Sequence, residues 1–187
     1  METGTWLGFG LLACILTLAA VTDCRTGRIP NRLTIPAMLA GIVIWTWSGA
    51  ADAGMPGAVT VAGQCLLALA IGFIPCALLV MLGGMGGGDA KLIGAMGALS
   101  ADWRFVVGAV FYGFVAGACI AVALMIRHRL VRRTAARISM ALLTLVGRRR
   151  PAMGDDSPRV PMGAALFVGA GVAGLERFGL LSWAWTP

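Results

Sequence analysis

Two aspartates in this sequence each stand beside a long apolar segment. Asp23 closes the first apolar run, and Asp89 follows a glycine-rich stretch at residues 83–88. A carboxylate near the boundary of a bilayer's hydrocarbon core is energetically expensive, so such a residue is a functional candidate by default. The remaining acidic residues lie in segments that connect apolar runs: Glu2, Asp52, Asp102, Asp155, Asp156 and Glu176.

Two aspartates brought together could hydrolyse a peptide bond. Both cannot ionise easily in a partly desolvated site, so the pair holds one proton between them over a range of pH. The ionised carboxylate takes a proton from the attacking water, while the protonated one hydrogen-bonds the scissile carbonyl and later helps to protonate the leaving amine. This chemistry needs neither a metal nor a cofactor, and we expect none. Asp23 and Asp89 are the predicted catalytic residues.

Other chemistries find little support. His128 is the only histidine and lies among arginines, which argues against Ser–His or Cys–His pairs and a histidine-rich metal site. The five cysteines form no CxxC pair, and four of them lie in apolar segments, so neither a zinc site nor a disulfide framework is expected. A phosphate loop and a dinucleotide fingerprint both fail at Asp89, which stands where the first needs lysine and the second glycine.

The composition places these aspartates in a membrane protein. Of the 187 residues 59% are hydrophobic and 12% charged, and the mean hydropathy is +0.87, whereas soluble domains are roughly 45–50% apolar. We expect an all-α polytopic integral membrane protein, folded as a single membrane-embedded domain over residues 1–187. Six apolar segments are predicted to cross the bilayer: 6–21, 35–47, 58–82, 90–101, 105–126 and 161–175.

Basic residues predict the orientation of these segments. With the N-terminus outside, 13 of the 15 Lys and Arg residues fall on the cytoplasmic side, and only Arg104 and Arg177 fall outside. This asymmetry is the one that the positive-inside rule requires. It also places Asp23 and Asp89 at one depth, at the cytoplasmic ends of their segments.

A basic cytoplasmic loop is predicted over residues 127–160. Its arginines recur at helical spacing, and residues 138–146 supply an apolar stripe too short to cross a membrane. An interfacial helix attracted to anionic lipid fits this pattern, and an ordinary solvated face explains the arginines equally well. We expect the loop to contact lipid headgroups or assembly partners. Nucleic acid is not an expected partner, despite the net charge of +7.

The glycine-rich stretch before Asp89 has two interpretations. Gly86, Gly87 and Gly88 permit positive φ and would let an extended substrate strand approach without a Cβ in the way. Alternatively, they form only a flexible turn between helices. Asp89 itself could be a simple helix N-cap, because AKLIGAMGAL follows it.

Two motifs taken together resemble the type IV prepilin peptidase family of membrane aspartic proteases. They are DCRTGRIPN at residues 23–31 and GGGDAKL at residues 86–92, which contains the GxGD signature, and RVPMGAALFVG at 159–169 is similar to the family's final helix. The resemblance implies that Asp23 and Asp89 form the catalytic dyad. The motif residues expected to support the substrate site are Arg25, Ile29, Pro30, Asn31, Gly86, Gly87, Gly88, Lys91 and Pro161.

The resemblance also implies a substrate and a location. The family cuts the short basic leader from prepilins at the cytoplasmic face of the bacterial inner membrane, and pilus assembly machinery is an expected partner. The chain looks like the short form found with tight-adherence (Flp-type) pili. Longer members carry CxxC motifs associated with N-methylation of the cut pilin; this sequence has none, so the resemblance does not extend to N-methyltransferase activity.

Two alternatives from other functional classes remain at this stage. Paired intramembrane carboxylates also serve proton- or ion-coupled transporters, whose sites tend to lie near the bilayer midplane. The chain could also be a non-catalytic subunit of a pilus or secretion assembly, whose aspartates would need no mutual contact.

Overall fold

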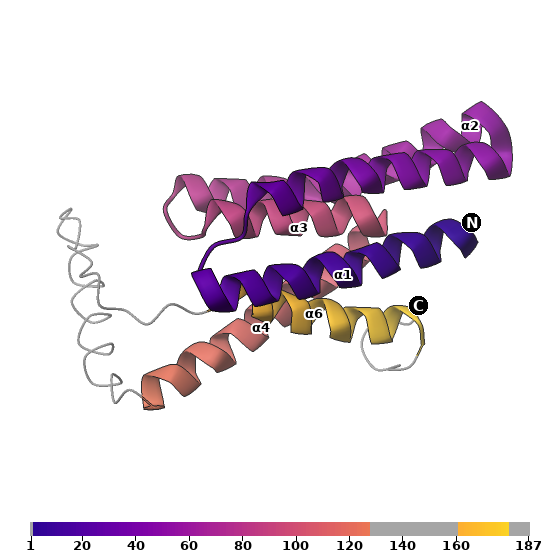
Figure 1. The fold of residues 1–187 in the computed structure, drawn as a ribbon. Coiled ribbons are helices and arrows are strands. Elements are labelled where there is room, and N and C mark those ends of the chain that lie inside the picture. The colour runs from indigo at the N-terminus through magenta and orange to yellow at the C-terminus, as the bar shows by residue number, and fades with distance from the viewer. Residues whose placement is uncertain (1, 128–160, 180–187) are drawn as a thin grey trace.

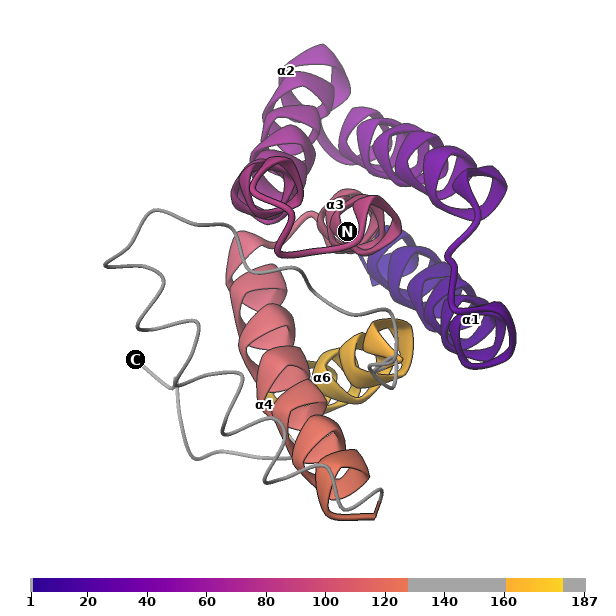
Figure 2. The same cartoon turned by 90° about the vertical axis from the view of Figure 1, so that its left-hand side faces the viewer.

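The computed structural model describes residues 2–127 and 161–179, and all regular structure in these ranges is helical (Figures 1 and 2). The expected all-α class is thus confirmed for this part of the chain. The helices are α1 (Glu2–Thr26), α2 (Asn31–Met81), α3 (Gly87–Ser100), α4 (Trp103–Arg127) and α6 (Met162–Arg177). The loop predicted at 127–160 lies outside the described residues except for Arg127.

Three helices in the described ranges, α1, α2 and α4, are long and apolar enough to cross a membrane. The sequence predicted six crossings. The other two helices are shorter, with 14 residues in α3 and 16 in α6. A 14-residue helix is roughly 21 Å long, which is less than the hydrocarbon core of about 30 Å. Length and hydropathy therefore support a membrane-embedded bundle but not a count of six.

Helix α2 accounts for two of the six predicted segments. It runs for 51 residues and leaves helical geometry only at Ala53 and Gly54, where Gly54 adopts a φ of 65°. The chain reverses at this bend, so that α2 forms two antiparallel halves (Figure 1). The sequence predicted a longer turn over 48–57. The turn is shorter because Pro56 falls in the first helical turn after the bend, a position that tolerates proline.

Helix α3 lies against both halves of α2 and is the most buried element of the described fold. Every residue from 92 to 100 is buried. Glycines allow the close approach: a Cβ at Gly41 would lie 2.4 Å from the Ala98 carbonyl oxygen, and one at Gly97 would lie 2.4 Å from that of Ala68. Backbones this close are typical of helices packed within membranes, where small residues line the interfaces.

The carbonyl groups at the end of α3 find partners on α2. Trp45 donates from Nε1 to the Leu99 oxygen at 2.8 Å, and Cys65 donates from Sγ to the Ala98 oxygen at 3.1 Å. The last carbonyls of a helix have no partner within the helix, and leaving them unpaired in a buried place is costly. These bonds fix α3, and therefore its first turn, relative to α2.

Helix α6 packs along α4 and also touches α1. A Cβ at Gly169 would lie 2.3 Å from the backbone nitrogen of Gly113, so α4 and α6 meet with their backbones in contact. At the other face, the start of α6 reaches the last turns of α1. This packing brings residues 161–163 beside Asp23, although 140 positions separate Asp23 from Gly163.

Candidate active site

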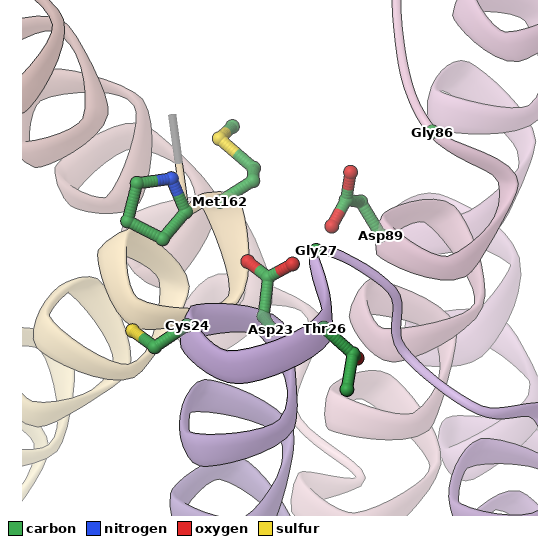
Figure 3. Close-up of a pocket in the computed structure, with 8 residues that line it drawn as sticks. Asp23, Cys24, Thr26, Gly27, Gly86, Asp89 and Met162 are labelled. Carbon is green, nitrogen blue, oxygen red and sulfur yellow. The ribbon is translucent and has the colours of Figure 1, made fainter. Parts of the chain in front are cut away.

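A cavity of about 670 Å³ opens where α1 ends and where α3 and α6 begin (Figure 3). The carboxyl groups of Asp23 and Asp89 both lie in it. We call this end of the bundle the aspartate end. The residues that line the cavity are Asp23, Cys24, Thr26, Gly27, Gly86, Asp89, Pro161 and Met162.

Asp23 is placed by the way in which α1 terminates. Gly27 adopts a φ of 62°, and its N–H donates to the Asp23 carbonyl at 2.8 Å, which is a common way for glycine to end a helix. Asp23 therefore lies in the last turn, and its side chain is half-buried. Its Oδ2 accepts a hydrogen bond of 2.7 Å from the N–H of Gly163 in α6.

Asp89 lies in the first turn of α3, outside the candidate membrane spans. The N-cap of α3 is Gly86, with φ −73° and ψ 137°, so Asp89 is the third helical residue. The alternative that Asp89 is merely the N-cap is therefore wrong. Its carboxylate folds back toward Gly86, where a Cβ would lie 2.8 Å from Oδ2, and it accepts a hydrogen bond from the Gly86 N–H.

The environment of Asp89 favours its protonated form. Burial and the negative charge of Asp23 together raise the pKa of Asp89 to about 6, although the N–H of Gly86 acts in the opposite direction. No Lys or Arg is present among the described residues that line the cavity. The two carboxylates therefore influence each other without a neutralising cation, which is the condition under which a pair shares a proton.

The three glycines before Asp89 have different surroundings. A Cβ at Gly88 would lie 3.1 Å from both Cβ and the carbonyl oxygen of Ile29, so the two motifs meet at this glycine. Gly87 has only Val80 within reach, at 3.9 Å. None of the three uses the positive φ that glycine permits: Gly86 has a φ of −73°, Gly87 and Gly88 are helical, and the positive φ of this stretch occurs at Gly83, at 77°.

Lys91 and Asn31 form a second contact between the motifs. The Nζ of Lys91 donates to Oδ1 of Asn31 at 3.0 Å, so the first residue of α2 is tied to the second turn of α3. Ile29 is buried and Pro30 is the N-cap of α2, while Arg25 is exposed in the last turn of α1. Of the predicted supporting residues, only Gly86 and Pro161 line the cavity itself.

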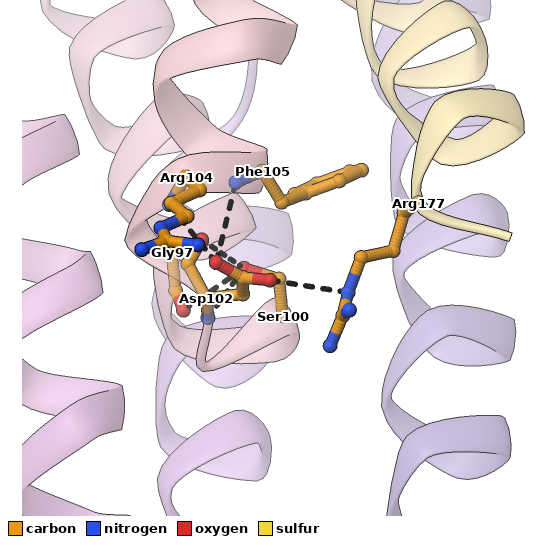
Figure 4. A network of polar contacts seen from close by, with 6 residues as sticks. All are labelled: Gly97, Ser100, Asp102, Arg104, Phe105 and Arg177. Atoms are coloured by element: carbon orange, nitrogen blue, oxygen red, sulfur yellow. Dashed lines mark hydrogen bonds and ion pairs between the residues drawn. The ribbon is translucent and has the colours of Figure 1, made fainter. Parts of the chain in front are cut away.

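A second polar cluster lies at the opposite end of α3 and α6 (Figure 4). Asp102 caps α4, because its Oδ1 accepts N–H bonds from Arg104 at 2.9 Å and Phe105 at 3.4 Å. Its Oδ2 pairs with Nε of Arg177 at 3.1 Å. Both oxygens of this carboxylate therefore have donors.

Sequence reasoning missed one polar contact at the cavity, the N–H of Gly163. A proline followed by a glycine at the start of an apolar helix is a weak signal that only a three-dimensional arrangement makes specific. Cys24, Thr26, Gly27 and Met162 were also not predicted to line the cavity. Within the described ranges, no three metal-ligating side chains (His, Cys, Asp or Glu) gather in one place.

Comparison with known proteins adds a family to this geometry. The model of the type IV leader peptidase family matches residues 10–122, which include Asp23 and Asp89. The prepilin leader peptidase/N-methyltransferases of Burkholderia pseudomallei strains 1026b and K96243 are each 32% identical to the chain over 122 residues. This match covers 65% of the chain and 38% of each relative. No solved structure matches the chain significantly.

Proposed function

The chain belongs to the type IV leader peptidase family, and from this premise we propose that it is an aspartic endopeptidase that removes the leader from prepilins. The observation that carries the proposal is the position of Asp23 and Asp89, which reach one cavity from different helices with no cation among its described lining residues. The raised pKa of Asp89 favours a proton on this carboxyl group, which supports its role as the acid.

The proposed reaction uses the two carboxylates as base and acid. The ionised aspartate takes a proton from a water molecule while the water oxygen attacks the scissile carbonyl carbon. The protonated aspartate hydrogen-bonds the carbonyl oxygen and stabilises the charge that develops there. The tetrahedral intermediate then collapses, the C–N bond breaks, and the amine leaves with a proton from the first aspartate.

The contacts around the dyad would hold the two aspartates in a fixed relative position. Gly88 against Ile29 and Lys91 against Asn31 join the two motifs, and both contacts lie close in sequence to Asp89. Productive catalysis needs reacting groups held within a fraction of an ångström. These residues are therefore proposed to act by positioning Asp89 rather than by touching the substrate.

We propose an orientation with the aspartate end facing the cytoplasm. In the described ranges this end carries more basic residues than the opposite end, as the positive-inside rule requires of a cytoplasmic face. The basic residues at the aspartate end are Arg25, Arg28, Arg32, Lys91 and Arg127, and those at the opposite end are Arg104 and Arg177. The N-terminus would lie outside, with six helical segments embedded in the inner membrane.

The family and the site support a proposed substrate class. A cavity with two carboxylates at the cytoplasmic boundary suits a basic leader that ends at an apolar helix. Flp-type prepilins are the proposed substrates and pilus assembly machinery the proposed partner. The proposal covers peptidase activity and not the methyl transfer in the relatives' name, because the match spans 38% of their length.

A reconstituted cleavage assay tests this function. The full chain in lipid vesicles is mixed with a Flp-type prepilin, and loss of the leader is followed by mass spectrometry. Asp23→Asn and Asp89→Asn should each reduce the cleavage rate by at least about 10³-fold. Retained cleavage in either variant would contradict the dyad. The transporter alternative instead predicts vesicle acidification or ion flux that depends on both aspartates.

A further inference from the structure

Asp23 and Asp89 differ in how the fold holds them. Asp23 is bound across two helices, because its Oδ2 receives the N–H of Gly163 at 2.7 Å. Gly163 is the second residue of α6, and N–H groups in a first turn have no partner within the helix. A carboxylate that accepts such an N–H is held in a fixed orientation, and this bond is short.

The absence of a side chain at Gly163 makes this contact possible. A Cβ there would lie 3.0 Å from Cβ of Asp23, 3.2 Å from its Oδ2 and 3.2 Å from the carbonyl oxygen of Ala19. The start of α6 thus packs closely against the last turns of α1. Gly163 lies outside the residues matched by the family model, which end at 122.

At Asp89, the effects that raise the pKa are stronger than the one that lowers it. Asp89 is half-buried, and its burial and the charge of Asp23 together outweigh the hydrogen bond from the N–H of Gly86. The net result is a pKa of about 6. The contact of Asp89 with Gly86 is local, between residues of one helix start, whereas the contact of Asp23 joins two helices. The surroundings of Asp89 therefore favour its protonated form.

Charged side chains other than the two aspartates do not explain this difference between Asp23 and Asp89. On α1, Cys24 is the other titratable group in the cavity and Arg25 is exposed. On α2, Cys76 is buried near Asp89. On α3, Lys91 donates to Asn31. The hydrogen bond that the described part of α6 gives to Asp23 comes from its backbone. The two aspartates thus differ in the contact of Asp23 with α6 and in the burial of Asp89.

We propose that Gly163 is a positioning residue of the active site, whose N–H fixes the Asp23 carboxylate so that it acts as the base, with Asp89 as the acid. The proposal deepens the peptidase function and rests on it. With Oδ2 engaged by Gly163, Oδ1 of Asp23 is the oxygen that takes the proton as an O–H bond of water breaks. Asp89 gives its proton to the carbonyl oxygen as the new C–O bond forms. On collapse the C–N bond breaks, the amine takes the proton from Asp23, and Asp89 recovers one from the hydroxyl group.

An amide-to-ester substitution tests the role of the N–H directly. Glycolate at position 163 replaces the N–H with oxygen and adds no side chain, and lactate at position 164 is the matched control in the same helical turn. We expect kcat to fall about 10-fold with the ester at 163 while KM stays within about twofold, as for a lost charge-assisted hydrogen bond that positions a catalytic group. An unchanged kcat, or the same fall with the ester at 164, would overturn the proposal.

A second measurement needs no peptidase activity. In the full chain labelled with carboxyl-¹³C aspartate, with signals assigned by Asp→Asn variants, the Asp23 signal should move with the ester at 163 and stay in place with the ester at 164. An Asp23 signal that is the same with and without the N–H of Gly163 would overturn the proposal. The expected movement in a protein that cuts no prepilin would support the role of Gly163 and count against the proposed function.

Discussion

The two polar ends of the described bundle use the same residue type in opposite ways. At one end, the oxygens of Asp102 accept two backbone N–H bonds and an ion pair with Arg177. At the aspartate end, Asp23 and Asp89 share a cavity that has no cation among its described lining residues. Satisfied carboxylates stabilise a fold, whereas like charges held together oppose it. The difference indicates that the aspartate end is organised for reactivity and the Asp102 end for stability.

The largest expected effect separates the two ends by activity. Asp89→Asn should lower prepilin cleavage by at least about 10³-fold, because the carboxyl group can no longer exchange a proton. Asp102→Asn should leave cleavage within about twofold, since it lies at the far end and asparagine still caps a helix. The cleavage assay described above, run on both variants, checks this contrast. A comparable loss in Asp102→Asn would erase the distinction between the ends.

Two neighbouring glycines sharpen the account of the aspartate end. Gly88→Ala places a Cβ 3.1 Å from Ile29 and should displace the first turn of α3, lowering kcat/KM by about 10- to 100-fold. Gly87→Ala is its control, because the nearest atom is 3.9 Å away and the residue is helical. Steady-state kinetics on both variants measure the difference. Equal rates would show that the contact between the motifs does not position Asp89.

Stability should change in opposite directions at the two ends. The pKa of Asp89 is raised from 3.8 to about 6. The stability that its protonated form contributes is therefore fully present below pH 4 and is lost as pH rises through 6, where the buried ionised carboxylate becomes a penalty. Asp89→Asn removes this penalty and should raise the melting temperature at pH 8 but not at pH 4. At pH 8, Asp102→Asn should lower the melting temperature. The loss in the free energy of unfolding should be at most about 1 kcal/mol, because the exposed ion pair with Arg177 is weak. Thermal unfolding at both pH values checks the two signs.

The smallest expected effect concerns Lys91. Lys91→Met keeps the aliphatic stem and removes the hydrogen bond to Asn31, and we expect a fall of about two- to fivefold in kcat/KM. Arg104→Met is the matched control at the opposite end and should leave kcat/KM unchanged. A loss approaching that of Asp89→Asn would instead place Lys91 in the chemistry itself.

The sequence was sufficient to predict the helices and the pairing of the aspartates. Long apolar runs, the glycines between them and the positions of Arg and Lys indicated an all-α membrane protein. They also predicted that Asp23 and Asp89 lie at the same depth in the membrane. The segment boundaries were less accurate. Helix α1 continues past residue 21 to Thr26, and α3 starts at Gly87 rather than at 90. Polar residues and glycines at helix ends are compatible with helix once neighbouring elements satisfy their backbone groups.

The contacts that organise the site could not be predicted from local sequence. The approach of Gly163 to Asp23 and of Gly88 to Ile29 depends on how close two backbones come. No periodicity or motif encodes such a distance in a single sequence. The same holds for α3, whose burial on all sides results from packing against both halves of α2.

The central claim is that Asp23 and Asp89 act as one electrostatic unit, and the titration of Asp89 tests it most directly. Carboxyl-¹³C NMR of the full chain should give Asp89 a pKa near 6. In Asp23→Asn the pKa of Asp89 should fall, because a neighbouring negative charge is removed. Asp102→Asn should leave it unchanged. A pKa of Asp89 that is the same with and without the Asp23 carboxylate would contradict the account.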